Sequence, residues 1–192
     1  MVMKIGVLAL QGAFVEHLYM LQRLGVEGVE VRLPHELSRL DGLIIPGGES
    51  TTIGKLAAMY QLIGPLRRFA DKKPLWGTCA GMILMAKEIG MNQSLLGVMD
   101  IAVERNAFGR QKESFEEDLY VGVLENGDSK PFRGVFIRSP RLVEVKGEAI
   151  EIARLADGTA VAARQGNLLV TAFHPELTDD TRFHQYFLDL IK

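Results

Sequence analysis

The first ninety residues alternate short apolar runs with segments of helical periodicity, and this alternation limits the folds open to the chain. The runs at 4–10 and 42–46 contain few polar residues, as expected for strands buried on both faces. Phe14, Leu18 and Leu21 recur at the spacing of a helix with one apolar face. Strands that alternate with helices build a parallel sheet covered by helices on both sides, so the pattern predicts an α/β fold.

The same patterns predict elements along the whole chain. In the first half, strands are expected at 4–10, 29–33, 42–46 and 74–77, and helices at 14–24, 52–60, 65–70 and 82–89. In the second half, short β-like runs are expected to extend the sheet with antiparallel strands at 101–103, 119–123, 134–137, 142–145, 149–155, 160–163 and 168–172, before a final helix at 179–191. The charge-rich stretch 105–118 is interpreted as a solvated loop. Since no Pro/Ser-rich linker divides the chain, residues 1–192 are expected to form a single domain.

Composition and charge argue against several classes of function. The formal net charge of −2 gives no electrostatic basis for binding nucleic acid or an anionic membrane. No apolar run approaches the ~20 residues that span a bilayer, and the N-terminal segment lacks the pattern of a signal peptide. Cys79 is the only cysteine, which precludes an intrachain disulfide and suits a reducing compartment. A cytoplasmic location is therefore expected.

The segment GTCAG at 77–81 indicates a catalytic nucleophile. It matches the G-x-S-x-G nucleophile elbow with cysteine in place of serine, and it has the preceding strand and following helix that this motif requires. The turn lifts the central side chain out of the sheet and places it near a helix N-terminus, which favours a thiolate. A lone cysteine is otherwise a small buried hydrophobe. The context favours Cys79 as a nucleophile.

A thiol nucleophile needs a base, and the base needs a partner that orients it. His174 ends the apolar run 168–173, and Glu176 follows two residues later. Pro175 disfavours a helical conformation at His174, so we expect an extended chain with both side chains on one side. A carboxylate placed there accepts the imidazole N–H and raises its basicity. His174 is thus the predicted base and Glu176 its orienting partner.

The other three histidines are interpreted as surface or packing residues. His17 falls in the first predicted helix, His184 near the polar side of the last one, and His35 in a turn. A surface His-Pro-Glu turn is the alternative interpretation of 174–176. The elbow upstream favours catalysis, because a nucleophile and its base need to be close in space and not in sequence.

Two adjacent glycines, Gly47 and Gly48, follow the third predicted strand. Their N–H groups can approach a ligand closely, and an acyl transfer needs such donors for the developing oxyanion. The N–H of Ala80 would supply another. A Gly-Gly turn capped by Ser50 or Thr51 at a helix start is compatible with this role. The loop fits no phosphate-binding motif, and one cysteine with scattered histidines gives no metal-ligand spacing, so neither a cofactor nor a metal is expected.

These motifs together resemble a known family. GTCAG at 77–81, PGG at 46–48 and HPE at 174–176 are similar to the class I, or triad, glutamine amidotransferases. Further segments narrow the resemblance to the glutaminase subunits of pyridoxal 5′-phosphate synthase over residues 4–190: LQGA at 10–13, PGGESTT at 46–52, VERNAFGRQ at 103–111, GVFIRSP at 134–140 and FHPELT at 173–178.

The resemblance implies a flavodoxin-like, three-layer α/β domain that hydrolyses L-glutamine with a Cys79–His174–Glu176 triad through a γ-glutamyl thioester. It also implies a set of glutamine-binding residues, which are Gly48, Glu49, Ser50, Arg105, Ile137 and Arg138. Ammonia would pass to a separate synthase subunit, in a hetero-oligomeric complex that makes pyridoxal 5′-phosphate (vitamin B6). From spacing alone, Arg105 would be interpreted as a solvated arginine.

Three other functions are alternatives at this point. The ammonia could feed a different synthase, such as that of imidazole-glycerol phosphate, although the segments 49–51 and 105–111 argue against it. A DJ-1-like stress or chaperone protein also places a cysteine at an elbow, but it would have no use for His174 and Glu176. A binding module without activity is disfavoured by the intact triad.

Overall fold

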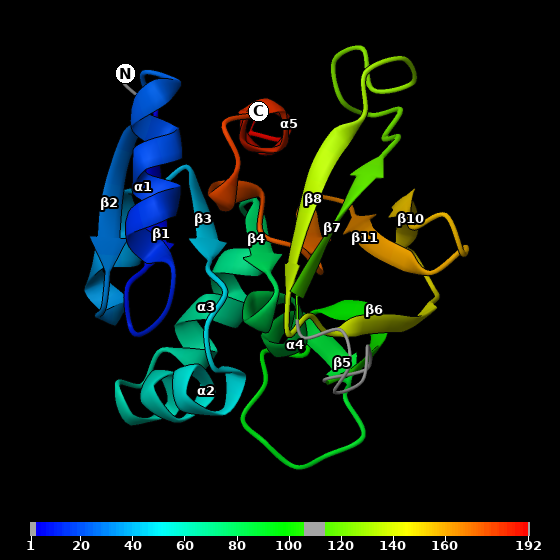
Figure 1. The fold of residues 1–192 in the computed structure, drawn as a ribbon. Helices are drawn as coiled ribbons and strands as arrows, with labels where there is room; N and C mark the ends of the chain where they lie inside the picture. The colour runs from blue at the N-terminus through cyan, green and yellow to red at the C-terminus, as the bar shows by residue number, and fades with distance from the viewer. Residues whose placement is uncertain (1–2, 106–113, 192) are drawn as a thin grey trace.

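The computed structural model describes residues 3–105 and 114–191 (Figure 1). Its strands are β1 (Lys4–Leu8), β2 (Glu27–Val31), β3 (Gly42–Ile45), β4 (Leu75–Thr78), β5 (Ala86–Glu88), β6 (Met99–Glu104), β7 (Ser114–Leu119), β8 (Phe132–Ile137), β9 (Arg141–Val145), β10 (Ile150–Arg154), β11 (Ala160–Gln165) and β12 (Leu168–Thr171). Its helices are α1 (Phe14–Arg23), α2 (Ser50–Met59), α3 (Ile63–Ala70), α4 (Ala80–Met85) and α5 (Arg182–Asp189), with the short 3-10 helices η1 (Pro34–Arg39) and η2 (Pro175–Leu177).

Within these residues the main sheet has seven strands in the order β10-β11-β12-β4-β3-β1-β2. The five strands from β12 to β2 are parallel, and β11 and β10 continue the sheet antiparallel. The predicted α/β fold, with a mostly parallel sheet and added antiparallel strands, is therefore confirmed. Two smaller sheets, β5-β6-β9 and β7-β8, hold the remaining strands. The expectation that the runs at 101–103, 119–123, 134–137 and 142–145 extend the main sheet is therefore wrong, because these segments pair among themselves and with β5.

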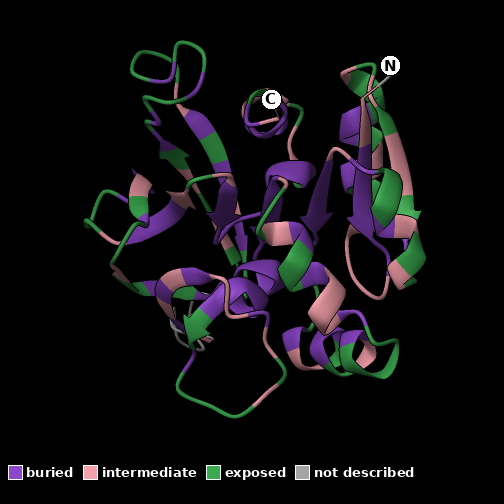
Figure 2. Cartoon of the chain, turned by 180° about the vertical axis from the view of Figure 1, so that it is seen from behind, coloured by how far each residue is buried: buried purple, intermediate pink, exposed green. Residues whose placement is uncertain are grey.

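Helices cover both faces of the main sheet, as Figure 1 shows. Trp76 of β4 points to the face covered by α1 and α5, where its ring contacts His17 and His184. The next residue, Gly77, points to the opposite face, where an added Cβ would lie 2.8 Å from Met85 Sδ of α4. The central strands β1, β3, β4 and β12 between these layers are buried almost throughout, whereas the edge strands β2 and β10 are partly exposed (Figure 2). This buried centre holds the loops at the sheet edge in fixed positions.

The register of three neighbouring strands places their carboxyl ends side by side. Ile45 of β3 pairs with Gly77 of β4, and Thr78 of β4 pairs with Thr171 of β12. The strand order also reverses between β1 and β3, since β2 lies on the outer side of β1. In open α/β sheets such a reversal leaves a crevice at the carboxyl ends of the strands, and ligands bind there. The segments 46–49, 79–81 and 172–176 all begin at this edge.

The bounds of some elements also differ from the sequence-based expectations. The helix expected at 82–89 ends at Met85, because Ala86 turns to an extended conformation and pairs with Met99 as β5. The strand expected at 119–123 lies earlier, at Ser114–Leu119, where it pairs with β8. The charge-rich stretch 105–118 is therefore a strand from Ser114 onward and not a loop, while 106–113 lies outside the described residues. In β7, Glu116 and Asp118 form ion pairs with Arg133 across the hairpin.

No helix among the described residues is long and apolar enough to cross a membrane.

We expect Gly81→Ala to destabilise the fold. An added Cβ at Gly81 would lie 2.2 Å from the Ile45 carbonyl oxygen, so α4 has to move away from β3. Overpacking of this kind lowers the free energy of unfolding by about 1–3 kcal/mol, which urea unfolding would detect. The matched control is Gly64→Ala in α3, where the nearest atom to the new Cβ is Arg68 Nη1 at 3.4 Å. Equal stability of the two variants would contradict the close approach of α4 to β3.

Candidate active site

Cys79 occupies a strained turn between β4 and α4. Its backbone has φ 49° and ψ −103°, a conformation that residues other than glycine rarely adopt. The turn is held from the neighbouring strand, because Cys79 N–H donates to the Thr171 carbonyl oxygen at 2.8 Å. The side chain is almost buried, with 6% of its surface exposed. The strand–turn–helix context that the GTCAG motif predicts is thus present.

His174 and Glu176 follow β12 and contact each other directly. His174 Nδ1 donates to Glu176 Oε1 at 2.7 Å, and the Glu176 side chain is fully buried. The predicted extended conformation is wrong, because Pro175 begins the 3-10 turn η2, and proline is favoured at the first helical position. The tight turn, and not strand alternation, brings the side chains of His174 and Glu176 together. His174 N–H donates to the Val135 carbonyl oxygen of β8 at 2.8 Å, which fixes the start of this turn.

The His174 imidazole is electrostatically coupled to both Cys79 and Glu176. Burial by itself disfavours the charged ring, but hydrogen bonds with Cys79 and Glu176 outweigh this effect and raise the pKa of His174 to about 10. Because Nδ1 is bonded to Glu176, Nε2 is the nitrogen left for proton exchange with the sulfur. The arrangement can therefore hold a thiolate beside an imidazolium, as a cysteine hydrolase requires.

Gly47 lies next to both Cys79 and His174. A Cβ at this position would be 2.4 Å from His174 Cε1 and 3.3 Å from Cys79 Cβ, so only glycine fits. The Gly47 carbonyl oxygen accepts from Ala13 N–H at 3.0 Å, which turns it away toward the loop after β1. Glu49 N–H donates to Gln11 Oε1 at 2.7 Å. The amides of Gly48 and of Ala80, the first residue of α4, remain as candidate oxyanion donors near the sulfur.

Glu49, and not Ser50 or Thr51, is the N-cap of α2. Its carboxylate accepts from Thr51 N–H at 3.0 Å and from Thr52 N–H at 2.8 Å. The Thr52 hydroxyl donates to it at 2.6 Å. These hydrogen bonds, the one from the Thr52 hydroxyl above all, lower the pKa of Glu49 to about 2. The carboxylate therefore stays ionised at the start of the helix.

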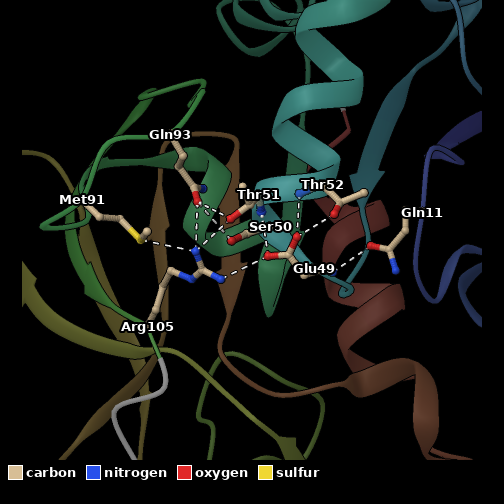
Figure 3. A network of polar contacts seen from close by, with 8 residues as sticks. All are labelled: Gln11, Glu49, Ser50, Thr51, Thr52, Met91, Gln93 and Arg105. Atoms are coloured by element: carbon tan, nitrogen blue, oxygen red, sulfur yellow. Dashed lines mark hydrogen bonds and ion pairs between the residues drawn. The ribbon is translucent and has the colours of Figure 1, made fainter.

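Arg105, at the end of β6, is held by this carboxylate. Arg105 Nη2 lies 3.1 Å from Glu49 Oε1, and Nη1 donates to Thr51 Oγ1 at 3.0 Å. Figure 3 shows the guanidinium between Glu49, Thr51 and Gln93. Gln93 Oε1 also accepts from Ser50 Oγ at 3.4 Å. Arg105 is thus part of a polar network over the start of α2 and is not a solvated side chain.

Ile137, the last residue of β8, and Arg138, which follows it, approach Cys79 from another side. Cys79 Sγ is 3.9 Å from the Ile137 carbonyl oxygen. Arg138 has φ 45°, a second strained backbone position next to the same sulfur. Strained backbone at the cysteine itself and at a residue that follows its nearest carbonyl is typical of a functional site. The structure therefore brings all the predicted site residues to one edge of the sheet. One group surrounds the thiol of Cys79, the other is the polar network of Glu49 and Arg105, and the Gly47–Gly48 segment lies between them.

Sequence reasoning missed the surroundings of Glu176. His17 and His184 are both completely buried, and His17 Nε2 lies 3.4 Å from Glu176 Oε2. His184 is therefore not on the polar side of α5. Helical spacing contained the signal, because His17 follows Phe14 by three residues and precedes Leu21 by four, which places it on the apolar face. Residues 3–105 and 114–191 contain no group of three or more His, Cys, Asp or Glu that could hold a metal ion.

Comparisons with known proteins agree with this geometry. The sequence pattern of the SNO glutamine amidotransferase family matches residues 7–192. Two curated relatives, from Herpetosiphon aurantiacus and Carboxydothermus hydrogenoformans, are both called "Pyridoxal 5'-phosphate synthase subunit PdxT". The first is 59% identical over 194 residues, covering 98% of this chain and 100% of the relative. The second is 55% identical over 191 residues, covering 98% of each.

Solved structures show the same fold. One, described as "Crystal structure of glutamine amidotransferase", is 51% identical with a TM-score of 0.91 and covers 97% of this chain and 98% of that chain. Another, described as "Structure of PurLQS from Thermotoga maritima", is 17% identical with a TM-score of 0.76 and covers 100% of both chains. At that identity it shows likeness of fold alone.

We expect the ring of His174 to titrate far above its ordinary pKa of 6.5. Since folding raises this pKa to about 10, the stability that ring protonation provides is complete below pH 6.5 and is lost as the pH rises through 10. Glu176→Gln should lower the His174 pKa, so that this loss begins at a lower pH. NMR titration of the ring, with urea unfolding at each pH, measures both effects.

His184 is the internal control in these spectra, because burial lowers its pKa to about 3 and its signal should stay constant between about pH 5 and 9. A His174 signal that titrates near pH 6.5 in both proteins would contradict the coupling to Glu176.

Proposed function

The chain belongs to the SNO glutamine amidotransferase family, and from this membership we propose that Cys79, His174 and Glu176 form its catalytic triad. The chain is the glutaminase subunit of pyridoxal 5′-phosphate synthase, which hydrolyses L-glutamine and supplies ammonia for vitamin B6 biosynthesis. The observation that carries the triad proposal is the 2.7 Å bond from His174 Nδ1 to Glu176 Oε1, beside the strained turn of Cys79.

In the first half of the reaction, the Cys79 thiolate adds to the side-chain amide carbon of glutamine. The amide oxygen becomes an oxyanion, and the N–H groups of Ala80 and of the Gly47–Gly48 segment stabilise it. The C–N bond then breaks as His174 Nε2 gives its proton to the departing nitrogen. Ammonia leaves, and a γ-glutamyl thioester remains on the sulfur.

In the second half, water hydrolyses the thioester. The thiolate is one of the two partners that raise the pKa of His174, and it no longer carries a charge once the thioester has formed. The neutral ring then takes a proton from water as the hydroxide oxygen adds to the thioester carbon. Collapse of this intermediate expels the thiolate and releases glutamate. Glu176 keeps the ring in one tautomer and orientation through both halves.

The groups around the thiol divide the binding of glutamine between them. Arg105 is a fixed cation that suits the α-carboxylate of an amino acid, and Glu49 and Thr51 hold it in place. Ser50 begins α2 beside this cation and Gly48 precedes it in the loop, while the Ile137 carbonyl oxygen at the end of β8 lies 3.9 Å from the sulfur and Arg138 follows it. In this proposal Glu49 acts partly through Arg105, because its own carboxylate is engaged in capping the helix.

The relatives' name implies a hetero-oligomeric complex with a synthase subunit. Direct transfer of ammonia within that complex goes further and is part of the proposal. Ammonia is largely protonated in neutral water and is then a poor nucleophile, so a sheltered path between the subunits protects it. We also propose that residues 1–192 work as one glutaminase domain, that the protein acts in the cytoplasm, where its single thiol stays reduced, and that it needs no cofactor.

Cys79→Ala should bind glutamine and release no glutamate. Removal of the nucleophile lowers kcat by at least about 10⁴-fold, whereas the groups that hold glutamine stay in place, so its Kd changes by less than about tenfold. Calorimetry measures binding and a glutamate assay measures turnover. The matched control is His35→Asn in η1, an exposed histidine outside the site, which should keep full activity. Measurable turnover by Cys79→Ala would remove the triad from the proposal.

Addition of the synthase subunit from the same cell should raise the glutaminase rate at least about fivefold, in line with coupling between two binding events. With a pentose phosphate, a triose phosphate and glutamine present, pyridoxal 5′-phosphate should form, and its absorbance is the measurement. A complex that contains Cys79→Ala should form it only from added ammonium salt. Full glutaminase activity without the synthase subunit would contradict activation by this partner. Failure to form pyridoxal 5′-phosphate would contradict the pairing with this synthase.

A further inference from the structure

Two histidines lie completely buried beneath the triad. His17 comes from α1 and His184 from α5, and both rings pack against Trp76, with ring centroids 5.6 and 4.9 Å away. A buried imidazole is expensive unless its polar atoms find partners, so a pair of them in a core calls for a reason beyond packing.

The pair connects to the buried end of the triad. His17 Nδ1 is 2.9 Å from His184 Nε2, and His17 Nε2 is 3.2 Å from Thr78 Oγ1. The same Nε2 lies 3.4 Å from Glu176 Oε2. His174 occupies the other oxygen, Oε1, whereas Oε2 is shielded from solvent and forms no well-aligned hydrogen bond within the described part of the chain. A buried carboxylate oxygen strongly favours a donor, and His17 Nε2 is in place to be one.

Electrostatics select the tautomer of His17. A lone pair on Nε2 would face the carboxylate oxygen and repel it, whereas an N–H there is attracted, so Nε2 carries the proton. His17 Nδ1 is then an acceptor, and His184 Nε2 donates to it. This leaves His184 Nδ1 as a bare lone pair, in agreement with its lack of a partner among the described residues, because an orphaned acceptor is tolerated better than an orphaned N–H. Burial lowers the pKa of both histidines, so the rings are neutral.

We propose that His17 is a positioning residue that donates its Nε2–H to Glu176 Oε2 and thereby fixes the carboxylate that orients His174. The inference rests on the proposed triad. The hydrogen-bonded chain runs from His184 through His17 and Glu176 to His174 and Cys79. With Oε1 bonded to His174 and Oε2 held by the Nε2–H of His17, which also lies 3.2 Å from Thr78 Oγ1, the carboxylate has little freedom to rotate about its terminal torsion, which is otherwise a soft one. Through His17 and His184, the helices α1 and α5 thus help to position the triad.

Two amide substitutions at one position test this role. The amide nitrogen of His17→Gln can occupy the place of Nε2 and still reach Glu176, whereas the shorter His17→Asn reaches only the place of Nδ1, toward His184. In the assembled complex we expect His17→Asn to lower kcat at least about tenfold, with KM changed by less than about twofold, because substrate contacts are intact. His17→Gln should stay within about threefold of the unsubstituted complex.

Trp76→Phe is the packing control, since it alters the same core around both rings and removes none of these hydrogen bonds; its kcat should stay within about threefold. An equal loss in His17→Asn and His17→Gln, or a loss in His17→Asn no larger than in Trp76→Phe, overturns the positioning role. If the unsubstituted complex releases no glutamate from glutamine, the proposed function has failed instead.

A second measurement needs no variant to fold. Nitrogen-15 NMR of the unsubstituted protein distinguishes protonated from bare ring nitrogens, and at neutral pH it should show His17 and His184 each protonated on Nε2 alone. A proton on His17 Nδ1 would overturn the inference, because Nε2 would then face Glu176 with a lone pair.

Discussion

The parallel pairing of β4 with β3 on one side and β12 on the other is the constraint on which the site depends. It places Ile45, Gly77 and Thr171 at the same edge, so the loops that leave these strands meet although they are far apart in sequence. One loop carries the sulfur, one the imidazole and carboxylate, and one the paired glycines. The strained turn at Cys79 persists because its N–H is bonded to β12 and Gly81 packs directly on Ile45.

Burial gives this edge its electrostatic character. Glu176 is shielded from water, and a carboxylate in such a place favours a cation beside it. His174 is that cation, and its own burial is outweighed by its two partners. The second oxygen of Glu176 faces His17 of α1. The charged groups at the thiol are therefore in contact with the layer of helices on one face of the sheet. The chemistry therefore draws on residues from both faces of the sheet.

The sequence was sufficient for the fold class and for predicting that Cys79, His174 and Glu176 come together, because apolar runs, an elbow motif and a His-Pro-Glu triplet are local patterns. It was insufficient where distant partners decide the conformation. The polar strand β7 forms because Arg133 neutralises Glu116 and Asp118 from the facing strand. The tight turn at Pro175 depends on a bond from His174 N–H to β8, and the burial of His184 on the packing of α5 over Trp76.

One backbone bond has a mechanical consequence. The Cys79 N–H donates to Thr171, three residues before His174, so the thiol and the imidazole are both positioned by the paired strands β4 and β12. The glycine pair has anchors of its own, because the Gly47 carbonyl oxygen accepts from Ala13 N–H and Glu49 N–H donates to Gln11, both just before α1. A tilt of α1 would therefore shift the amides of Gly47 and Gly48 relative to Cys79 and His174.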